Sequence, residues 1–336
     1  MSLMDSIYGK AKANPLRVAF PETEEEKIVQ AAMECREKGY CIPVFVGNKE
    51  EILSQTAGYG IDITGVEIAD TSDDAWLTEL SEEYVKVNPI FSVKAMKRKS
   101  KKDSMNAALM MEVLDRIDVT FSGMSHTTGD VVLAAQTFIG LQDGITTPSS
   151  IGVCEFPEYK TSEGNLLIVG DSAVCQNPTA EDLASIAITT CGTAQDLLGW
   201  DPRCALLSFS TTGSADGDLV QKVVRAREIA NEKRPDLKID GEFQLDAALL
   251  PASAKKKVNR ESSVAGKANI LIWPDLNVGN ISIKLIQQLG KADAYGPCLQ
   301  GFKKIACDCS RSAPVSEVVG NVAISVVRAQ ALKEKK

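Results

Sequence analysis

Apolar and polar positions follow a strand–helix–strand rhythm through the N-terminal part of the chain. Residues 16–20 form a short, mainly apolar run, and residues 41–46 form a continuous one, which is typical of a strand that helices cover on both faces. Between them, apolar residues recur at helical spacing until Gly39, a residue type that commonly ends a helix. A second helix is predicted over residues 49–56 and a third strand over residues 66–69. This alternation predicts an α/β fold with mainly parallel sheets flanked by helices.

The same rhythm returns in the second half of the chain. Thr23 with Glu26 has the spacing of a capping box at a helix start, and Thr179 with Asp182 has it again. Pro314 is expected in the first turn of a C-terminal helix, where proline is tolerated. The predicted strands cover residues 166–169, 205–210 and 270–273, and the predicted helices cover residues 218–233, 281–289 and 315–332, besides the one that Thr179 opens.

The length of the chain predicts more than one hydrophobic core. At 336 residues the chain is longer than one hydrophobic core usually organises, so two domains are expected. The polar segment at residues 146–150 is the best candidate for the crossing between them, and a return is expected near residues 295–300. We therefore expect a discontinuous domain I, residues 1–146 plus 297–336, and a domain II, residues 147–296.

Composition and charge exclude several classes of protein. Hydrophobic residues make up 44% and charged residues 24%, values typical of a globular protein and not of a disordered one. The formal net charge of -8 argues against general nucleic-acid binding. No apolar run is long enough to cross a bilayer, and the N-terminal segment lacks the apolar core of a signal peptide. We expect a cytoplasmic protein without a membrane or nucleic-acid partner.

The cysteines predict packed thiols and no metal site. There are nine, an odd number, and most lie in apolar segments, which suits reduced and buried thiols better than a disulfide framework. Cys307 and Cys309 form a C-x-C pair, and His126 is the only histidine. A zinc site would need two further ligands at suitable spacing, and none stand nearby.

Common catalytic signatures are missing, and two segments remain as candidates. The sequence has no P-loop, no G-x-G-x-x-G after the first strand and no G-x-S-x-G. The basic run at residues 94–102, KAMKRKSKK, is either a solvated helix face or a surface that attracts a polyanionic small ligand. Ser310 and Arg311 directly precede a predicted helix, whose N-terminus attracts phosphate, and Glu317 lies in its first turns. The alternative for this second segment is a serine cap beside a surface arginine and glutamate.

Short sequence blocks that match a known family follow one another along the chain. The blocks are RVAFPE (17–22), SGMSHTT (122–128), GD (170–171), NPTAE (177–181), LSFSTTGS (207–214), KRPDLKIDG (233–241), QLDAA (244–248), VAGKA (264–268), PDLNVGN (274–280), GPCLQG (296–301) and DCSR (308–311). No single matching block is specific, but the order of many blocks is. By these blocks the chain resembles, over nearly its whole length, the phosphate acetyltransferases (phosphotransacetylases), in the phosphate acetyl/butyryltransferase group.

This resemblance implies a fold and a reaction. The fold is two α/β domains of the isocitrate/isopropylmalate-dehydrogenase-like type, with the active site in the cleft between them and usually a homodimer. The reaction is acetyl-CoA plus phosphate giving acetyl phosphate plus CoA, without a metal or a covalent enzyme intermediate. CoA is then a substrate, and no cofactor is permanently bound. Two alternatives remain: an enzyme for propionyl or butyryl groups, and a non-catalytic homologue that binds CoA or phosphate.

The resemblance also implies roles for individual residues. Ser310 and Arg311 hold the acyl phosphate, and Glu317 is the base for the CoA thiol. Polar, glycine-containing loops at strand ends are where α/β folds bind ligands, so further substrate contacts are expected in the matching loops. The expected substrate-binding residues are Ser125, His126, Thr127, Thr128, Asn277, Gly279, Asn280, Gln300 and Gly301.

The chain departs from the family pattern mainly at positions that are expected to bind CoA. The family usually has aspartate where Glu317 stands and glycine where Ser312 stands. It has an arginine that helps bind CoA or phosphate where this chain has Leu133. A second family arginine aligns approximately with Lys94. We expect Lys94, Lys97 and Arg98, all in the basic run, to compensate for Leu133 by binding the phosphates of CoA.

Overall fold

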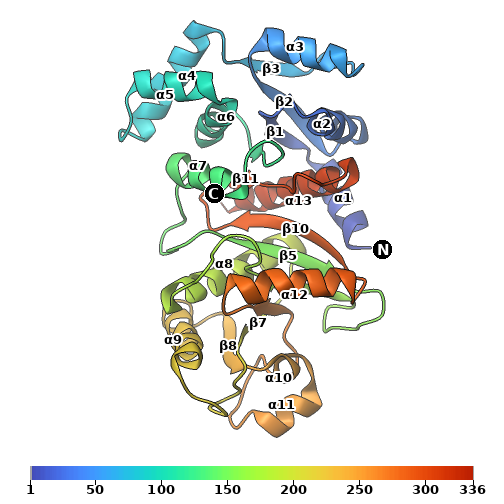
Figure 1. Cartoon of the computed structure of the whole chain (residues 1–336), viewed down its shortest axis with the longest axis vertical. Coiled ribbons are helices and arrows are strands. Elements are labelled where there is room, and N and C mark those ends of the chain that lie inside the picture. Colours follow the sequence, from blue (N-terminus) through green and yellow to red (C-terminus); the bar gives the residue numbers. More distant parts are fainter. Residues whose placement is uncertain (1, 336) are drawn as a thin grey trace. The chain divides into compact units, whose positions relative to one another are not determined.

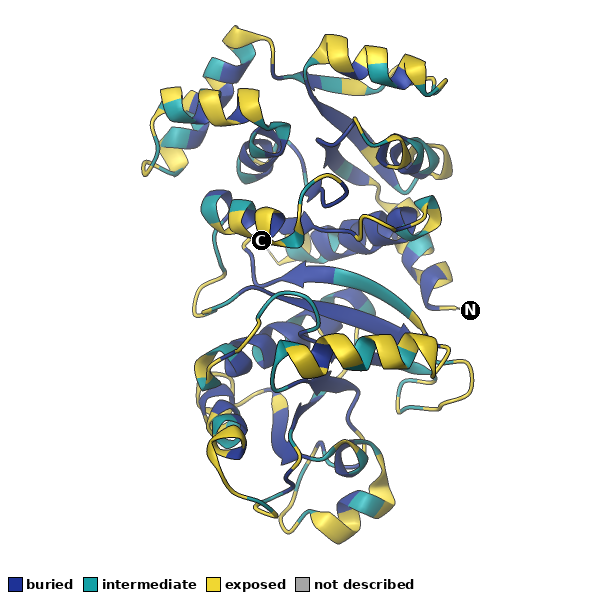
Figure 2. Cartoon of the chain, viewed as in Figure 1, coloured by how far each residue is buried: buried dark blue, intermediate teal, exposed yellow. Residues whose placement is uncertain are grey.

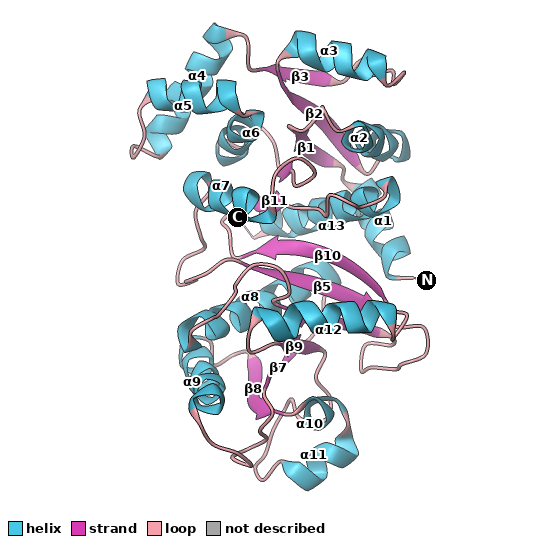
Figure 3. Ribbon diagram, viewed as in Figure 1, coloured by secondary structure: helices cyan, strands magenta, loops and turns pink. Residues whose placement is uncertain are grey.

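The computed structural model describes residues 2–335, which form two compact units (Figure 1). Unit 1 combines Met1–Gly140 with Phe302–Lys336, and unit 2 is the continuous segment Leu141–Gly301. The sequence placed the two crossings between residues 146 and 147 and between residues 296 and 297, so each differs from the observed division by a few residues. Each unit contains one sheet with helices packed on it, and the α/β prediction is confirmed (Figure 3).

Unit 1 is built on a five-stranded sheet in which every pairing is parallel. Its strand order is β11-β4-β1-β2-β3. The rings of Phe20, Phe45 and Phe121, from the three central strands, pack together in the core. The strands are β1 (Leu16–Phe20), β2 (Cys41–Gly47), β3 (Glu67–Asp70), β4 (Val119–Phe121) and β11 (Ile305–Cys307).

Eight helices surround this sheet among the described residues of unit 1. The last of them, α13, packs against β1, β4 and β11, and most of its length is buried (Figure 2). It is the one described helix that is long and apolar enough to span a bilayer, but 67% of its apolar window is buried in the fold, as in a core helix. The helices are α1 (Leu3–Ala13), α2 (Glu26–Lys38), α3 (Lys49–Gly58), α4 (Asp74–Val87), α5 (Val93–Lys102), α6 (Ser104–Val113), α7 (Thr128–Phe138) and α13 (Val315–Glu334).

Unit 2 contains a six-stranded mixed sheet in the order β10-β5-β6-β9-β7-β8. The four strands from β6 to β8 run parallel, and β5 pairs antiparallel with both β6 and β10. The strands are β5 (Ser149–Glu155), β6 (Leu166–Gly170), β7 (Arg203–Leu207), β8 (Lys238–Phe243), β9 (Ile270–Ile272) and β10 (Asp293–Gln300). The helices are α8 (Ala180–Leu198), α9 (Asp218–Lys233), α10 (Leu245–Leu249), α11 (Pro251–Lys257) and α12 (Leu276–Gln288).

Several local predictions are wrong. The capping box of Thr23 with Glu26 does not form, because Glu25 is the N-cap of α2 and the Thr23 hydroxyl donates to Gln55 Oε1. Pro314 is the N-cap of α13 and lies just before its first turn. Helix α12 begins five residues earlier than predicted, because the Asp275 side chain caps it. The predicted strand over residues 205–210 instead covers Arg203–Leu207.

Candidate active site

The loops that follow β1, β4 and β11 lie at one edge of the unit 1 sheet. After β1 the chain adds β2 and β3 on one side, and β4 and β11 then form on the other side. The strand order therefore reverses between β1 and β4, and such switch points are where open α/β sheets bind ligands at the carboxyl ends of their strands. Residues 122–128 and 308–311, which carry two of the expected groups of site residues, begin directly at these ends.

Glu22 organises the loop after β4. Its side chain is fully buried, and its carboxylate accepts hydrogen bonds from the N–H groups of Gly123 (3.0 Å), Met124 (2.8 Å) and His126 (3.1 Å). Burial opposes ionisation, but the hydrogen bonds from the His126 ring and these N–H groups outweigh it and lower the pKa of Glu22. A buried carboxylate thus fixes the backbone on which Ser125 and His126 lie.

His126 is held between two carboxylates. Its Nδ1 lies 2.7 Å from Glu22 Oε1, and its Nε2 lies 3.3 Å from Asp103 Oδ2. Asp103 first and Glu22 second raise the pKa of His126 to about 10, so the ring is a cation at neutral pH. Both ring nitrogens are engaged within the protein, and this arrangement suits a clamp on the loop better than direct contact with a substrate.

Thr127 and Thr128 begin helix α7 and reach the second loop. The Thr127 hydroxyl forms a capping box with Asp130. The Thr128 hydroxyl donates to Asp308 Oδ2 at 2.6 Å, which ties the loop after β4 to the loop after β11. A Cβ atom at Gly123, where φ is +111°, would lie 2.1 Å from Asp308 Oδ1, so only glycine fits there. Burial raises the pKa of Asp308 to about 6 despite the Thr128 hydrogen bond.

The three expected catalytic residues follow Asp308. Ser310 and Arg311 are exposed, and Ser310 Oγ lies 3.0 Å from Ser312 Oγ. Among residues 2–335 the Arg311 guanidinium has no hydrogen-bond or ion-pair partner, although its charge favours the ionised form of Asp308. Glu317 lies in the first turn of α13, where partial burial raises the pKa of its carboxyl. A free guanidinium and a carboxyl with a raised pKa are suited to phosphate binding and to proton transfer.

Ser125, the remaining expected residue of this loop, is exposed, and its hydroxyl donates to Glu24 Oε1 at 2.6 Å. The structure thus brings together Ser125–Thr128 and Ser310-Arg311 at one edge of the unit 1 sheet.

The basic run forms helix α5, and part of its charge is already paired. Lys97 and Lys101 donate to the two oxygens of Asp74 at 2.7 and 2.8 Å and lower the pKa of that carboxyl to about 2, Lys101 having the larger effect. Lys94 and Arg98 are exposed and form no ion pair within the described part of the chain. Leu133, on α7, is 64% exposed. Of the expected CoA contacts, Lys97 is the least available.

The expected site residues of unit 2 occupy helix α12 and the end of β10. The sequence predicted a loop at these positions. The structure instead has the first turns of α12 there, and these turns carry Asn277, Gly279 and Asn280. Gly279 packs so closely that a Cβ atom there would lie 2.1 Å from the carbonyl oxygen of Asp171, while Asn280 Nδ2 donates to the Ser172 carbonyl at 3.3 Å.

Gln300 ends β10, and Gly301 follows it as the last residue of unit 2. Gln300 is buried and hydrogen-bonds to the hydroxyls of Ser149, Thr190 and Thr193. Gly301 is buried with φ at +94°, a conformation that favours glycine. These contacts account for Gln300 and Gly301 as residues that hold unit 2 together.

Sequence reasoning missed three acids of the unit 1 site. Glu22, Asp103 and Asp308 were not singled out, yet they position His126 and Thr128. A signal was present for Glu22 and Asp308, because each is a carboxylate directly after an apolar strand and inside a block that matches the family. No group of three or more metal-ligating side chains occurs among residues 2–335.

Comparison with known proteins gives these loops a context. The family model described as phosphate acetyl/butaryl transferase matches residues 2–326. The chain belongs to this family. It is 38% identical over 331 residues to the phosphate acetyltransferase of Thermoanaerobacterium thermosaccharolyticum, with 98% of this chain and 100% of that protein covered. It is also 38% identical over 331 residues to the phosphate acetyltransferase of Clostridium acetobutylicum, with 98% and 99% covered.

Solved structures agree with this membership. A phosphotransacetylase from Streptococcus pyogenes matches with a TM-score of 0.89 and 32% identity, over 99% of this chain and 100% of that one. The 4-hydroxythreonine-4-phosphate dehydrogenase of Klebsiella pneumoniae matches with a TM-score of 0.55 and 10% identity, over 94% and 98% of the two chains. At that identity the second likeness concerns the fold alone, and it agrees with the dehydrogenase-like architecture expected from the sequence.

Proposed function

We propose that this protein is a phosphate acetyltransferase that transfers an acetyl group reversibly between acetyl phosphate and CoA. The observation that carries the proposal is the retention of Ser310, Arg311 and an acidic residue at 317 in a chain that belongs to the family. Within unit 1 these residues follow the buried Asp308, next to the loop that Glu22 and Thr128 hold in place.

The proposed chemistry needs only these side chains. Glu317 accepts the proton of the CoA thiol, and the thiolate attacks the carbonyl carbon of acetyl phosphate. A thiol of pKa about 8.5 is mostly protonated at neutral pH, so a base with a raised pKa lowers the barrier. The Ser310 hydroxyl donates to the oxyanion of the tetrahedral intermediate. The carbon–oxygen bond to phosphate then breaks, and Arg311 binds the departing phosphate through its planar fork of N–H groups.

Turnover assays test this proposal directly. The purified protein should form a thioester from CoA and acetyl phosphate, and release one phosphate for each thioester. Propionyl and butyryl phosphate, assayed in parallel, decide the acyl preference. Glu317→Gln should lower kcat by orders of magnitude, whereas Glu317→Asp should retain much of it. A wild-type protein that binds CoA but turns over none of the three acyl phosphates would instead be a non-catalytic homologue.

The contacts expected from unit 2 are also part of the proposal. Asn277 and Asn280 are exposed in the first turns of α12 and are available to a substrate. Alanine at either position should raise the KM for a substrate, and Asn277→Ala should do so without lowering thermal stability. An unchanged KM for both substrates in both variants would assign these asparagines to the fold only.

We further propose a cytoplasmic homodimer. Helix α12 and its C-cap expose apolar side chains at helical spacing, Val278, Ile281, Leu285 and Leu289. Exposed apolar faces of this kind commonly mark protein–protein contacts, and a second copy of the chain is the partner proposed here. Sedimentation should give a dimer mass, and Ile281→Glu with Leu285→Glu should give a monomer. A wild-type monomer would refute the dimer. None of the nine cysteines forms a disulfide bond, which suits a reducing compartment.

A further inference from the structure

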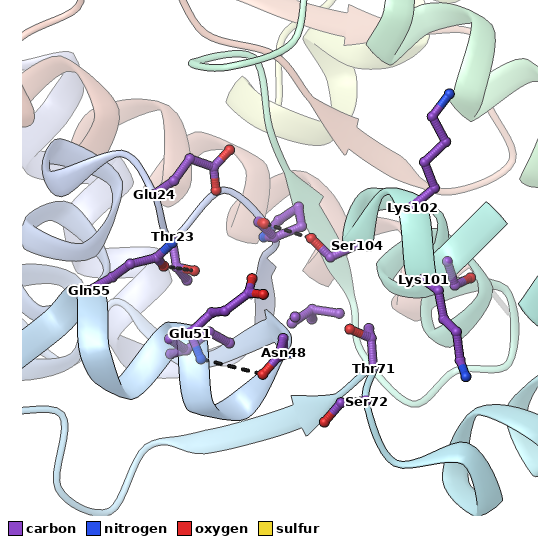
Figure 4. Close-up of a pocket in the computed structure, with 15 residues that line it drawn as sticks. Thr23, Glu24, Asn48, Glu51, Gln55, Thr71, Ser72, Lys101, Lys102 and Ser104 are labelled. Carbon is purple, nitrogen blue, oxygen red and sulfur yellow. Dashed lines mark hydrogen bonds between the residues drawn. The ribbon is translucent and has the colours of Figure 1, made fainter. Parts of the chain in front are cut away.

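A polar pocket opens at the carboxyl ends of β1, β2 and β3, on the same edge of the sheet as the candidate catalytic loops (Figure 4). Its volume of about 380 Å³ lies in the range of small-molecule sites. Figure 4 shows Asn48 and Glu51 of α3 facing Thr71 and Ser104 across it. Pro21, Val46 and Ile52 add apolar surface to its lining. None of the site residues expected from the sequence lines this pocket.

One buried hydroxyl in the lining lacks a partner. Ser100 is 1% exposed, and its Oγ makes no hydrogen bond within residues 2–335. A serine inside a helix usually donates to the carbonyl four residues earlier, and a buried polar group without a partner is costly. Ser100 is also one of the residues that line the pocket, so its hydroxyl is a candidate partner for a ligand there.

Other groups in the lining offer both donors and acceptors. Asn48 and Gln55 use their side-chain oxygens as acceptors within the protein, which leaves their amide N–H groups for a ligand. Glu51 offers a carboxylate that accepts no hydrogen bond among the described residues. The two acids and two lysines of the lining balance in charge. Such a lining favours a neutral polar group that both donates and accepts, such as a purine with its ribose.

Cations for phosphate groups lie at the rim. Lys101 is paired with Asp74, but Lys102 is exposed and unpaired among residues 2–335, and its side chain points away from Lys101 (Figure 4). Arg98, one turn earlier on α5, is likewise exposed and unpaired. The pocket therefore suits a ligand whose neutral purine lies in the pocket and whose phosphates lie beside it on the basic helix α5.

The distance along the sheet suits a long substrate. Glu24 lines the pocket and also accepts the hydrogen bond of Ser125, so the pocket adjoins the catalytic loops. Three strand spacings separate β11, which precedes Ser310, from β2 at the pocket, or roughly 15 Å. CoA carries its thiol and its adenosine at opposite ends of an extended pantetheine arm.

We infer that this pocket binds the adenosine of CoA, with the adjacent phosphates on Arg98 and Lys102 and the thiol directed along the sheet edge toward Ser310. The inference rests on the proposed function, because it assigns the far end of the same substrate. The amine and ring nitrogens of adenine and the ribose hydroxyl pair with Glu51, Gln55 and Ser100. It also adds Lys102 to the cations expected to hold the CoA phosphates.

Truncated substrate provides the test. Pantetheine has the same thiol as CoA and lacks the nucleotide. Ser100→Ala should raise the KM for CoA about fivefold, the value of one hydrogen bond, and leave the KM for pantetheine unchanged. Glu51→Trp, which places a large ring at the mouth, should raise the CoA KM about tenfold or more, again with pantetheine unaffected. Glu50→Trp is the matched control, because Glu50 is the exposed neighbour of Glu51 on α3 and does not line the pocket.

The remaining outcomes separate this inference from the proposed function. Equal losses with both thiols, or no loss with either, overturn the adenosine site. Circular dichroism and thermal melting of each variant check the fold, and Ser100→Ala should not lower the melting temperature because its hydroxyl has no partner. If the wild type turns over neither thiol, the proposed function fails. Calorimetry with adenosine 3′,5′-bisphosphate then still tests the pocket: binding that Glu51→Trp abolishes supports it, and binding unchanged in that variant overturns it.

Discussion

Glu112 gives the sharpest prediction about stability, because it is a fully buried acid in the core of unit 1. Its Oε2 lies 2.7 Å from the Thr120 hydroxyl, and its Oε1 accepts from the Ile305 N–H at 2.9 Å. It therefore links β4 to the start of β11. Burial raises the pKa of Glu112 to about 8, although the Thr120 hydrogen bond and the nearby Lys304 oppose the shift.

The direction of the pH dependence follows from the protonation of Glu112 in the folded and unfolded states. The folded protein keeps the proton of Glu112 up to about pH 8, whereas the unfolded chain loses it near pH 4.5. The free energy of unfolding should therefore fall as the pH rises through this window, by about 1.4 kcal/mol per pH unit. Between pH 4.5 and pH 7 the free energy of unfolding falls by at most about 3 kcal/mol, because water that enters near Glu112 makes the decrease smaller.

Glu112→Gln removes this titration and keeps the shape. In the variant the amide oxygen accepts from the Ile305 N–H, and the amide nitrogen replaces Oε2, so it donates to Thr120 Oγ once that hydroxyl turns to accept. Urea unfolding followed by circular dichroism should give similar stabilities for the two proteins at pH 5. At pH 8 the variant should be more stable by a few kcal/mol. His126 titrates in both proteins, so it cancels in the difference, and Glu50→Gln serves as the exposed control. A difference that stays constant from pH 5 to pH 8 would refute the reasoning.

The remaining predictions concern the site and unit 2. Arg311→Ala should lower kcat/KM by orders of magnitude with an unchanged melting temperature, and Arg311→Lys should rescue it only partly, because an ammonium lacks the fork; near-normal turnover would make Arg311 a surface residue. The charged His126 ring stabilises the wild-type fold, so the free energy of unfolding should fall between about pH 6.5 and pH 10 as the ring loses its proton. In His126→Gln this pH-dependent decrease should be absent. Leu133→Arg should lower the KM for CoA, and less so at high salt. Gly279→Ala should destabilise the protein by about 3 kcal/mol in thermal unfolding, because its Cβ meets the Asp171 carbonyl.

The sequence predicted elements whose signals are local. Helix α8 begins with the capping box of Thr179 and Asp182, as expected, and it ends at Gly199 in the left-handed conformation. The same signal failed at Thr23, because a contact 32 positions away takes its hydroxyl to Gln55. Strand β4 has only three residues and is buried on both faces, so no periodicity identifies it.

The candidate site likewise has residues that the sequence predicts and residues that only the fold reveals. Ser310, Arg311 and Glu317 are close in sequence and could be read from one motif. The bond between Thr128 and Asp308 joins residues 180 positions apart, and that between Glu22 and Gly123 spans 101. Such pairs become visible only when the strand order is known, because β1, β4 and β11 are neighbours in the sheet and not in the chain.

The discontinuity of unit 1 has a consequence for synthesis on the ribosome. Unit 2, Leu141–Gly301, is one continuous segment and emerges complete before Phe302–Lys336. Until that last segment arrives, unit 1 lacks its edge strand β11 and helix α13, and the apolar surfaces of β1, β4 and α2 that α13 covers stay open to solvent or chaperones. Asp308, Ser310, Arg311 and Glu317 all lie in this segment. The nascent chain therefore acquires its candidate catalytic groups in the same step that closes its first core, so an incompletely folded unit 1 would lack these groups.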